Sequence, residues 1–564
     1  MSIQQEYDAI VIGTGITGGW AAKELCEKGI KTLVLERGPM IKHITDYPTM
    51  NMDPWDFEFK GRQTREEAKR QEKQARTGYV TKKEHSHFFV DDIKHPYNEV
   101  KRFDWIRGYQ VGGRSLTWGR QSYRLSDIDF EANKKEGVAI DWPIRYRDIS
   151  KWYDYVEEYI GVSGEKLGLP QLPDGIFSPP MELNCVEKHL KENIAGNYND
   201  RVLTIGRTAH ITGNKQHKGR SNCQYRDRCM RGCPFGAYFS SNSATLPAAE
   251  ATGNMTLRPN SIVQEVIYND QLKKATGVKV IDVETKKKMI FNSKIIFVCA
   301  STVPTTAILM QSKSKRFPNG LGNDSGELGH NLMDHHINAG AFAKVKGFED
   351  KYYKGRRPNG LYIPRFRNLG GSKTTKKFLR GYGYQGGAGR GNVSEFVAEV
   401  AYGANLTKKI LEPGDWKISL DGFGECLPYH DNKMTLDYNK TDEWGLPTVT
   451  FDAEWKENEL EMRKDMIQQA IEMLEKAGYS DITSRDDVGA PGIGIHEMGT
   501  ARMGSDAKTS VLNENNQVHG VPNVYVTDGA CMTSAGCQNP SLTYMALTVR
   551  AANHAAEQFK KIKA

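Results

Sequence analysis

The chain has 564 residues, of which 38% are hydrophobic and 26% charged, as is ordinary for a globular protein. This composition excludes a disordered, collagen-like or disulfide-stapled chain, and a net charge of +8 is too small for a chain of this size to indicate nucleic-acid binding. No apolar run is long enough to cross a bilayer, and the N-terminal residues lack the features of a secretory signal.

The first predicted elements are a strand, a glycine-rich turn, a helix and a second strand. Gly13 would permit the tight turn, Gly15 the close approach of a pyrophosphate, and Gly18 the packing of the helix on the strand. Glu36, at the end of the second strand, would accept hydrogen bonds from ribose hydroxyls. The pattern predicts a Rossmann-type dinucleotide-binding unit, with its strands at residues 7–12 and 31–36 and its turn at residues 13–18.

Residues 41–94 interrupt this alternation of strands and helices. The segment Lys60–Arg76 is strongly charged and helix-prone, which predicts a solvated insertion or the edge of a lid. His85 and His87 lie two residues apart; a metal site is one interpretation, and ordinary surface or strand histidines are the favoured one.

Short β-like runs alternate with turns further along the chain, and they predict an antiparallel sheet that would carry the substrate. A helix that ends at Gly478 follows. The runs are at residues 341–347, 361–366, 396–402, 417–423, 433–438 and 447–451, and the apolar face of the helix is predicted to contain Leu460, Ile467, Ala470, Ile471 and Leu474.

Several widely separated motifs identify a family. They are RGYQVGGRSLTWG at 107–119, the segment 297–309, GHNLMDH at 329–335, HEMGTARMG at 496–504, VHGV at 518–521, YVTDG at 525–529 and NPSLT at 539–543. In this order and spacing they resemble the glucose–methanol–choline (GMC) oxidoreductases, a family of FAD enzymes. The resemblance covers the whole chain.

The resemblance implies an α/β fold, α+β overall, in which a Rossmann-type FAD-binding domain is interleaved with an antiparallel-sheet substrate domain. The FAD-binding domain would comprise residues 1–40, 95–125, 200–336 and 488–564. A charged insertion or lid would occupy residues 41–94, and the substrate-binding domain residues 126–199 and 337–487.

The resemblance matches His496 to the family's active-site histidine and Asn539 to its partner. Oxidising an alcohol requires removal of the hydroxyl proton and transfer of a hydride to the flavin, and a histidine that titrates near neutrality suits the proton step. An amide that hydrogen-bonds the same oxygen can orient it without competing for the proton. Thr117 stands where some sugar oxidases of the family carry a histidine that attaches FAD covalently, so the resemblance implies dissociable FAD.

The residues expected at the FAD include the glycine-rich turn and the family motifs. They are Gly13, Thr14, Gly15, Ile16, Thr17, Gly18, Glu36, Arg37, Arg107, Val111, Gly112, Gly113, Ser115, Thr117, Trp118, Gly119, Val263, Ala300, Ser301, Asp528, Gly529, Asn539, Pro540 and Ser541.

Three cysteines, Cys223, Cys229 and Cys233, form a compact group that ends in a proline. Their spacing matches no zinc pattern and a disulfide would leave one cysteine over, whereas soft thiolates suit an iron–sulfur cluster. Three structural cysteines are the alternative. The loop at residues 218–240 resembles the insert that holds a 3Fe-4S cluster in bacterial FAD sugar dehydrogenases of this family, although a four-iron cluster stays open.

Other charges and thiols complete this picture. Arginines at 220, 226, 228 and 231 would raise the reduction potential of such a cluster or meet an acidic electron acceptor. Cys531 and Cys537 flank a flavin motif and are interpreted as buried packing cysteines.

The resemblance favours a sugar or glycoside dehydrogenase, most similar to the glucoside 3-dehydrogenases that oxidise a ring C3 hydroxyl. Glucose 1-, gluconate 2- and fructose 5-dehydrogenases are the alternatives within the group. An oxygen-using sugar oxidase is the second hypothesis, and a non-redox lyase or binding protein the third, which an electron-relaying cluster would disfavour.

Relatives with this insert pair with a small subunit that carries the export signal, and often with a cytochrome c acceptor. The resemblance therefore implies a periplasmic protein exported with its partner, with a cytoplasmic location as the alternative. Any membrane association would come only through the partner.

Overall fold

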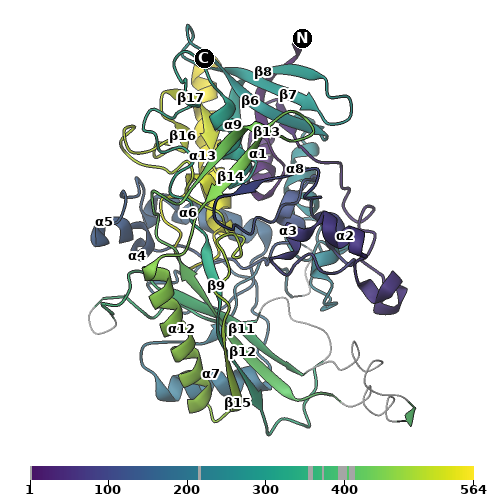
Figure 1. Ribbon diagram of the computed structural model, residues 1–564, viewed down its shortest axis with the longest axis vertical. Helices are drawn as coiled ribbons and strands as arrows, with labels where there is room; N and C mark the ends of the chain where they lie inside the picture. The colour runs from purple at the N-terminus through teal and green to yellow at the C-terminus, as the bar shows by residue number, and fades with distance from the viewer. Residues whose placement is uncertain are drawn as a thin grey trace.

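The computed structural model describes residues 3–213, 217–353, 360–370, 374–390, 403–404 and 413–563. Figure 1 shows two layered parts: one, in which both ends of the chain lie, is built on a mainly parallel sheet, and the other on an antiparallel sheet flanked by helices. None of the helices in the described residues is long and apolar enough to cross a membrane.

The first sheet has eight strands, of which six run in the order β16-β17-β8-β1-β2-β5. The strands from β17 to β5 pair in parallel, whereas β16 is antiparallel to β17, and β6 and β7 extend the sheet from β8 as antiparallel strands. The strands are β1 (Ile3–Ile12), β2 (Thr32–Leu35), β5 (Met255–Arg258), β6 (Ser261–Asn269), β7 (Lys274–Asp282), β8 (Lys288–Val298), β16 (Gln517–Val518) and β17 (Val521–Val526).

Helices cover this sheet because its central strands are apolar on both faces. Val11 of β1 packs in one cluster with Leu25 of α1 and Ala552 of α13, whereas the neighbouring Ile10 and Ile12 belong to a second cluster. The helices of this part are α1 (Ile16–Glu27), α6 (Tyr146–Ile160), α8 (Thr245–Glu250), α9 (Thr302–Gln311) and α13 (Ser541–Lys563).

Helix α6 lies within a segment expected in the substrate domain, but it packs against α13. Its buried residues Ile149, Tyr153 and Val156 share a cluster with Ile10 and Ile12 of the first sheet. The apolar face of α6 thus packs against α13 and the first sheet, although residues 126–199 were expected to belong to the substrate domain.

The second sheet has six strands in the order β15-β9-β12-β11-β10-β4, all antiparallel. It contains the predicted runs at 341–347, 361–366 and 417–423, and the run at 396–402 lies outside the described residues. Its elements are β4 (Thr204–Ile205), β9 (His335–Val345), β10 (Leu361–Ile363), β11 (Tyr382–Arg390), β12 (Trp416–Glu425), β15 (Ser480–Asp486) and the covering helices α7 (Cys185–Asn197) and α12 (Glu457–Lys476).

The last two predicted runs belong elsewhere. Strands β13 (Lys433–Thr441) and β14 (Pro447–Asp452) form a separate three-stranded sheet with β3 (Asn98–Glu99). Phe451 of β14 stacks on Phe103 with ring centroids 4.1 Å apart, and this aromatic contact holds the small sheet beside the motif at 107–119. The expectation of one antiparallel sheet from 337 to 455 is wrong for this hairpin.

Helix α12 ends at Lys476, and Gly478, two residues beyond it, has a φ of 74°. The buried face of α12 matches the predicted one in part: Ala470 and Leu474 are buried, but so are Met462, Met466 and Met473, whereas Leu460 is 40% exposed. Methionines fit the irregular surface of β9 and β12, and they set which side of the helix turns inward.

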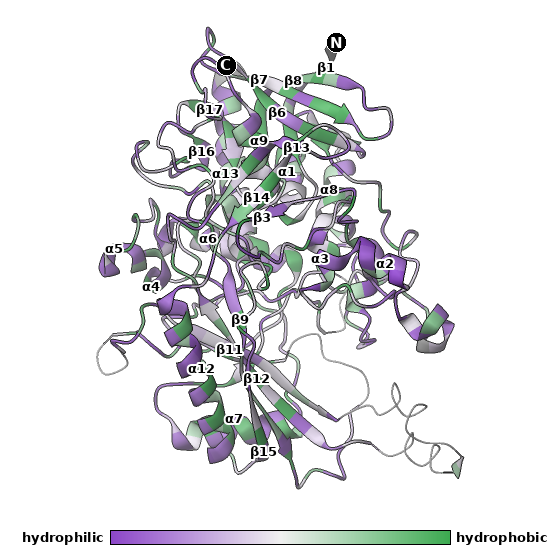
Figure 2. Ribbon diagram, viewed as in Figure 1, coloured by the Kyte–Doolittle hydropathy of each residue, from purple (hydrophilic) through white to green (hydrophobic). Residues whose placement is uncertain are grey.

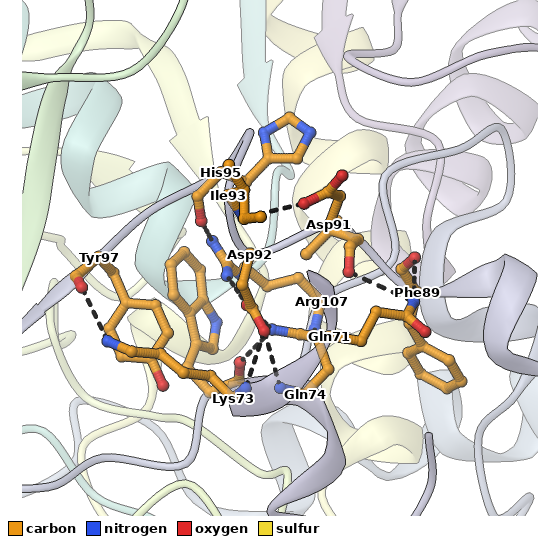
Figure 3. A network of polar contacts seen from close by, with 12 residues as sticks. Gln71, Lys73, Gln74, Phe89, Asp91, Asp92, Ile93, His95, Tyr97 and Arg107 are labelled. Carbon is orange, nitrogen blue, oxygen red and sulfur yellow. Dashed lines mark hydrogen bonds and ion pairs between the residues drawn. The ribbon is translucent and has the colours of Figure 1, made fainter. Parts of the chain in front are cut away.

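The insertion at residues 41–94 contains only short helices and turns, and Figure 2 shows α2 as mainly hydrophilic. Figure 3 shows Asp92 at the centre of a polar network that attaches the insertion to Arg107. Asp92 accepts hydrogen bonds from the backbone of Lys73 and Gln74 and pairs with Arg107 Nη2 at 3.0 Å. The remaining short helices are α2 (Arg65–Arg70), α3 (Glu72–Ala75), α4 (Asp127–Phe130) and α5 (Ala132–Glu136).

Candidate active site

A cavity of about 1970 Å³ opens where the parallel strands of the first sheet end and extends to the face of the second sheet. The turns after β1, β2, β8 and β17 all line it, because the carboxyl ends of parallel strands meet at one edge. Single-ligand pockets usually measure about 300–1,000 Å³, so this cavity has room for a nucleotide cofactor together with a substrate.

The glycine-rich turn forms one wall of the cavity. A Cβ on Gly13, whose φ is 96°, would lie 2.4 Å from the carbonyl oxygen of Cys299, and one on Gly18 would lie 1.9 Å from the carbonyl oxygen of Gly13. A Cβ on Gly15 would meet nothing within 4 Å, since this residue borders open space. Gly13 and Gly18 therefore serve backbone packing, and Gly15 leaves the start of α1 open to an anion.

Glu36 is tied to the same turn. Its carboxylate accepts hydrogen bonds from the backbone N–H of Thr14 at 3.0 Å and of Gly38 at 3.1 Å. Thr14 Oγ1 in turn accepts from the N–H of Gly112 at 2.9 Å, which joins the glycine-rich turn to the motif at 107–119. Burial raises the pKa of Glu36, and its side chain still borders the cavity.

Arg37 lies at the same end of the cavity. Its guanidinium lies 4.6 Å from the ring centre of Tyr109 and 5.3 Å from that of Trp444, and Nη2 pairs with Asp442 at 3.0 Å. Tyr109 and Asp442 line the cavity but were not singled out from the sequence, because Asp442 comes from the hairpin of β13 and β14. These contacts fix Arg37 in place beside Glu36.

The structure brings most of the residues expected at the cofactor to this cavity. Gly18, Val111, Gly112 and Pro540 do not line it and instead support the backbone beside it. Those that do line it are Gly13, Thr14, Gly15, Ile16, Thr17, Glu36, Arg37, Arg107, Gly113, Ser115, Thr117, Trp118, Gly119, Val263, Ala300, Ser301, Asp528, Gly529, Asn539 and Ser541.

His496 and Asn539 also meet at the cavity. Asn539 Nδ2 lies 3.4 Å from His496 Nε2, although the residues are 43 positions apart. The carboxylate of Asp334 accepts hydrogen bonds from the backbone N–H groups of Gly492, Gly494 and His496 at 2.8 to 2.9 Å. Burial raises the pKa of Asp334 to about 7, and this buried carboxyl group holds the histidine loop in place.

A second histidine, His335 at the start of β9, contacts the first. Its Nδ1 lies 2.8 Å from Nδ1 of His496, and its Nε2 lies 2.7 Å from the carbonyl oxygen of Gly536. Burial lowers the pKa of His335 to about 4. Burial, then the neighbouring His335 and Arg114, lower the pKa of His496 well below its usual value, so both imidazoles are neutral at pH 7.

The second sheet supplies a polar floor opposite the first sheet. Gln385 of β11 and Asp421 of β12 are cross-strand neighbours, and Gly340 separates Asp421 from Arg485 on β15. All three side chains line the cavity, and Gln385 Nε2 donates to Asn539 Oδ1 at 2.6 Å. Asp421 Oδ1 is covered and has no hydrogen-bond partner in the described residues.

Sequence patterns gave no signal for this polar floor. Its residues come from three separate strands and are united only by register, so alternation within one strand could not single them out. We name the set of Gln385, Asp421 and Arg485 the polar floor.

The cysteine loop lies at the edge of the same cavity, which its residues Tyr225, Asp227 and Met230 help to line. Burial raises the pKa of the Cys223 thiol to about 11, and the charges of Cys229 and Cys233 act in the same direction. Across the described residues, however, no three His, Cys, Asp or Glu side chains are grouped closely enough to hold a metal ion. The three thiols are thus neighbours without forming a ready ligand set, and the iron–sulfur cluster stays a prediction.

The arginines of this loop contact the chain itself. Arg226 Nη2 donates to the carbonyl of Met50, Arg228 pairs with Asp53, and Arg231 pairs with Glu84 at 2.8 Å. They attach the insertion to the cysteine loop, so the expectation that they face an acidic partner protein is not needed to explain them. Cys531 and Cys537 are buried, as packing cysteines would be. The two histidines singled out from the sequence, His85 and His87, lie in the insertion at residues 41–94.

Comparison with known proteins identifies the family. Two models described as GMC oxidoreductase match residues 7–337 and 428–548. The chain is 29% identical to 2-methyl-1,2-propanediol dehydrogenase of Mycolicibacterium austroafricanum, over 99% of this chain and 96% of that protein. It is 23% identical to the large subunit of fructose dehydrogenase of Gluconobacter japonicus, over 98% of each.

Solved structures agree on the fold. Formate oxidase of Aspergillus oryzae RIB40, in a structure concerned with modification of its FAD, superposes with a TM-score of 0.61 at 15% identity and covers 100% of both chains. At this identity the similarity shows the fold alone, and it confirms the expected combination of a Rossmann-type FAD-binding domain with a second sheet.

Proposed function

The chain belongs to the GMC oxidoreductase family, and from that premise we propose that it is a dehydrogenase that oxidises a hydroxyl group of a sugar or glycoside. Membership makes it an FAD-dependent oxidoreductase that acts on hydroxyl groups. The observation that carries the proposal is the polar floor, which lines the same cavity as His496 and Asn539.

The residues present fit FAD. The open space beside Gly15, the start of α1 and the buried carboxyl groups of Glu36 and Asp528 border a cavity large enough for a dinucleotide. When bound, FAD supplies the acceptor for the hydride that leaves the substrate carbon. Non-covalent binding is part of the proposal, and Thr117, which lines the cavity, supports it because its hydroxyl is a poor attachment point compared with a histidine.

The chain's own residues handle the proton. His496 is neutral, so its free ring nitrogen can accept the hydroxyl proton of a substrate in the cavity. Asn539 Nδ2 lies beside that nitrogen and can donate a hydrogen bond to the same substrate oxygen. The removal of this proton makes the carbon a better hydride donor.

A substrate with several hydroxyl groups suits the polar floor. Gln385, Asp421 and Arg485 offer an amide, a carboxylate and a guanidinium to groups on the far side of the substrate. The two relatives compared act, by their names, on a diol and on fructose. The favoured reaction is oxidation of a ring C3 hydroxyl, and the alternatives are oxidation of glucose at C1, gluconate at C2 or fructose at C5.

We extend the proposal to the electron acceptor. A 3Fe-4S cluster on Cys223, Cys229 and Cys233 would pass electrons singly to a cytochrome-type partner, and the place of this loop at the cavity edge supports that role. Export to the periplasm with a small subunit, rather than a cytoplasmic location, completes the proposal. An oxygen-using oxidase is the competing activity.

A panel of substrates tests the proposal. The purified chain is supplied with glucose, methyl glucoside, fructose, gluconate and propane-1,2-diol, with either oxygen or a one-electron dye as acceptor, and the products are identified by NMR. Sugar oxidation with the dye and without peroxide supports the proposal. Peroxide formation would establish the oxidase, and turnover of the diol alone would remove sugars as the substrate class.

A further inference from the structure

His335, His496 and their partners form a series of hydrogen bonds whose direction can be worked out from one end. The series begins at the carbonyl oxygen of Gly536, which can only accept a hydrogen bond. His335 Nε2 lies 2.7 Å from that oxygen, so this nitrogen must carry the proton. A neutral imidazole has one proton, and therefore Nδ1 of His335 bears a lone pair.

The next link transmits this choice to the active site. His335 Nδ1 and His496 Nδ1 lie 2.8 Å apart, a distance that requires one proton between them. Since His335 Nδ1 has the lone pair, the proton belongs to Nδ1 of His496. The opposite nitrogen of His496, Nε2, is then unprotonated, and it is the nitrogen beside Asn539.

The remaining links run in the same direction. Because His496 Nε2 accepts, its partner in Asn539 must be the amide nitrogen, which lies 3.4 Å away. The carbonyl oxygen of Asn539 then accepts from Gln385 Nε2 at 2.6 Å. The direction derived from Gly536 therefore agrees with the orientation of the Asn539 and Gln385 amides at the other end of this series of hydrogen bonds.

We propose that His335 is a positioning residue that holds His496 in the Nδ1-protonated tautomer, so that Nε2 is always the bare nitrogen that meets the substrate hydroxyl. The inference deepens the proposed function and rests on it for its catalytic meaning. His335 itself does not line the cavity and acts only through His496. It is fully buried at the start of β9, and the neighbouring Asp334 holds the backbone of His496.

Two isosteric substitutions separate this role from simple packing. In His335→Asn the side-chain oxygen can take the place of Nδ1 and accept from His496, but the bond to Gly536 is lost. In His335→Gln the amide nitrogen can take the place of Nε2 and donate to Gly536, but no acceptor faces His496. A structural role predicts similar damage from both substitutions, whereas a tautomer role predicts that only the second is severe.

The experiment measures anaerobic flavin reduction by a substrate found in the panel, in the FAD-loaded protein and both variants. We expect His335→Gln to slow reduction by about 100-fold or more with FAD content and KM unchanged, because a wrong histidine tautomer can cost up to about 10⁴-fold in rate. His335→Asn should stay within about tenfold of the unaltered protein, because it loses one neutral hydrogen bond. Equal losses in the two variants would overturn the proposal.

A second measurement needs no substrate. In protein labelled with ¹⁵N-histidine, the protonated and bare ring nitrogens have well-separated shifts, and the signals of His496 are those missing from His496→Ala. We expect Nδ1 protonated in the unaltered protein and in His335→Asn, and a mixture of tautomers in His335→Gln. A bare Nδ1 in the unaltered protein would refute the inference, whereas failure of every panel substrate would refute only the proposed function.

Discussion

Arg114 Nη2 lies 2.8 Å from Oε2 of Glu497, the residue that follows His496 in the chain. The Glu497 side chain is 1% exposed, and the guanidinium is largely covered. The pair joins the motif at 107–119 to the loop that contains His496. The positive charge of Arg114 also helps to lower the pKa of His496, after the larger effects of burial and of His335.

Replacing Arg114 with methionine removes that charge and leaves the Glu497 carboxylate without its partner. Both changes favour a protonated His496 and raise its pKa. Only the neutral imidazole can accept the substrate proton. As the solution is acidified, the rate of flavin reduction should therefore fall at a higher pH in Arg114→Met than in the unaltered protein. The control Arg114→Lys keeps the charge. If the rate of flavin reduction falls at the same acidic pH in Arg114→Met as in the unaltered protein, Arg114 does not affect the pKa of His496.

Asp421→Asn tests the polar floor. Asp421 lines the cavity and its carboxylate can accept a hydrogen bond from a substrate hydroxyl, and a bond to a charged group corresponds to a change of about 10- to 100-fold in kcat/KM. The loss should appear mainly in KM, because Asp421 would bind a hydroxyl that takes no part in the proton or hydride transfer. Asp415→Asn, at an exposed carboxylate just before β12, is the matched control.

The result is sharpened by a deoxy substrate. If Asp421 binds a particular hydroxyl, removing that hydroxyl from the substrate should lower the activity of the unaltered protein. The same removal should have little effect on Asp421→Asn, in which the bond is already lost. A variant that weakens every substrate equally, or none, would show that the carboxylate does not contact the substrate.

Glu425 predicts a pH dependence of stability. This glutamate is buried at the end of β12, 3.7 Å from Arg380, and burial raises the pKa of its carboxyl group to about 7. The pKa of this carboxyl group is higher in the folded than in the unfolded protein. Its contribution to the free energy of unfolding is therefore fully present below about pH 4.5 and is lost as the pH rises through about 7. Glu425→Gln removes this titration.

Thermal unfolding of the two proteins checks the sign. The difference in Tm, Glu425→Gln minus the unaltered protein, should increase as the pH rises from about 5 to 8. Other buried carboxyl groups, such as Asp334, are common to both proteins and cancel in the difference. A difference in Tm that stays constant, or that falls with pH, would show that Glu425 is charged in the folded state.

Cys229→Ser tests the proposed cluster. We expect the chain purified without oxygen to contain iron and inorganic sulfide, and the substitution to lower both and to slow electron transfer to a cytochrome or dye while flavin reduction by substrate is spared. Cys185→Ser, on α7 and outside the loop, should change nothing. Absence of iron from the unaltered protein would refute the cluster, and the dehydrogenase would then need a direct route from the flavin.

The sequence was sufficient where the structure depends on neighbours along the chain. The glycine-rich turn, Glu36 and the ends of β1 and β2 could be predicted, because turn, helix and strand signals are local. The pairing of β14 with β3 could not, since β3 consists of only Asn98 and Glu99 and carries no pattern of its own.

The site shows the same limit. His496 and Asn539 were identified by family motifs, whereas His335 lay inside a motif with no role attached to it. Its importance depends on the carbonyl of Gly536, which tertiary folding alone brings to its side. Gln385 and Asp421 likewise gain meaning from strand register, a property that one sequence does not reveal.

The most direct test of the central claim is a visible spectrum recorded without oxygen before and after a glycoside such as methyl glucoside is added. The account predicts flavin bands that bleach in the unaltered protein and persist in His496→Ala, with FAD content equal in both. His430→Ala, at an exposed histidine outside the cavity, should bleach normally. Bleaching in His496→Ala at the rate of the unaltered protein would contradict the assignment of the proton step, and flavin bands that no sugar bleaches would contradict the proposed substrate class.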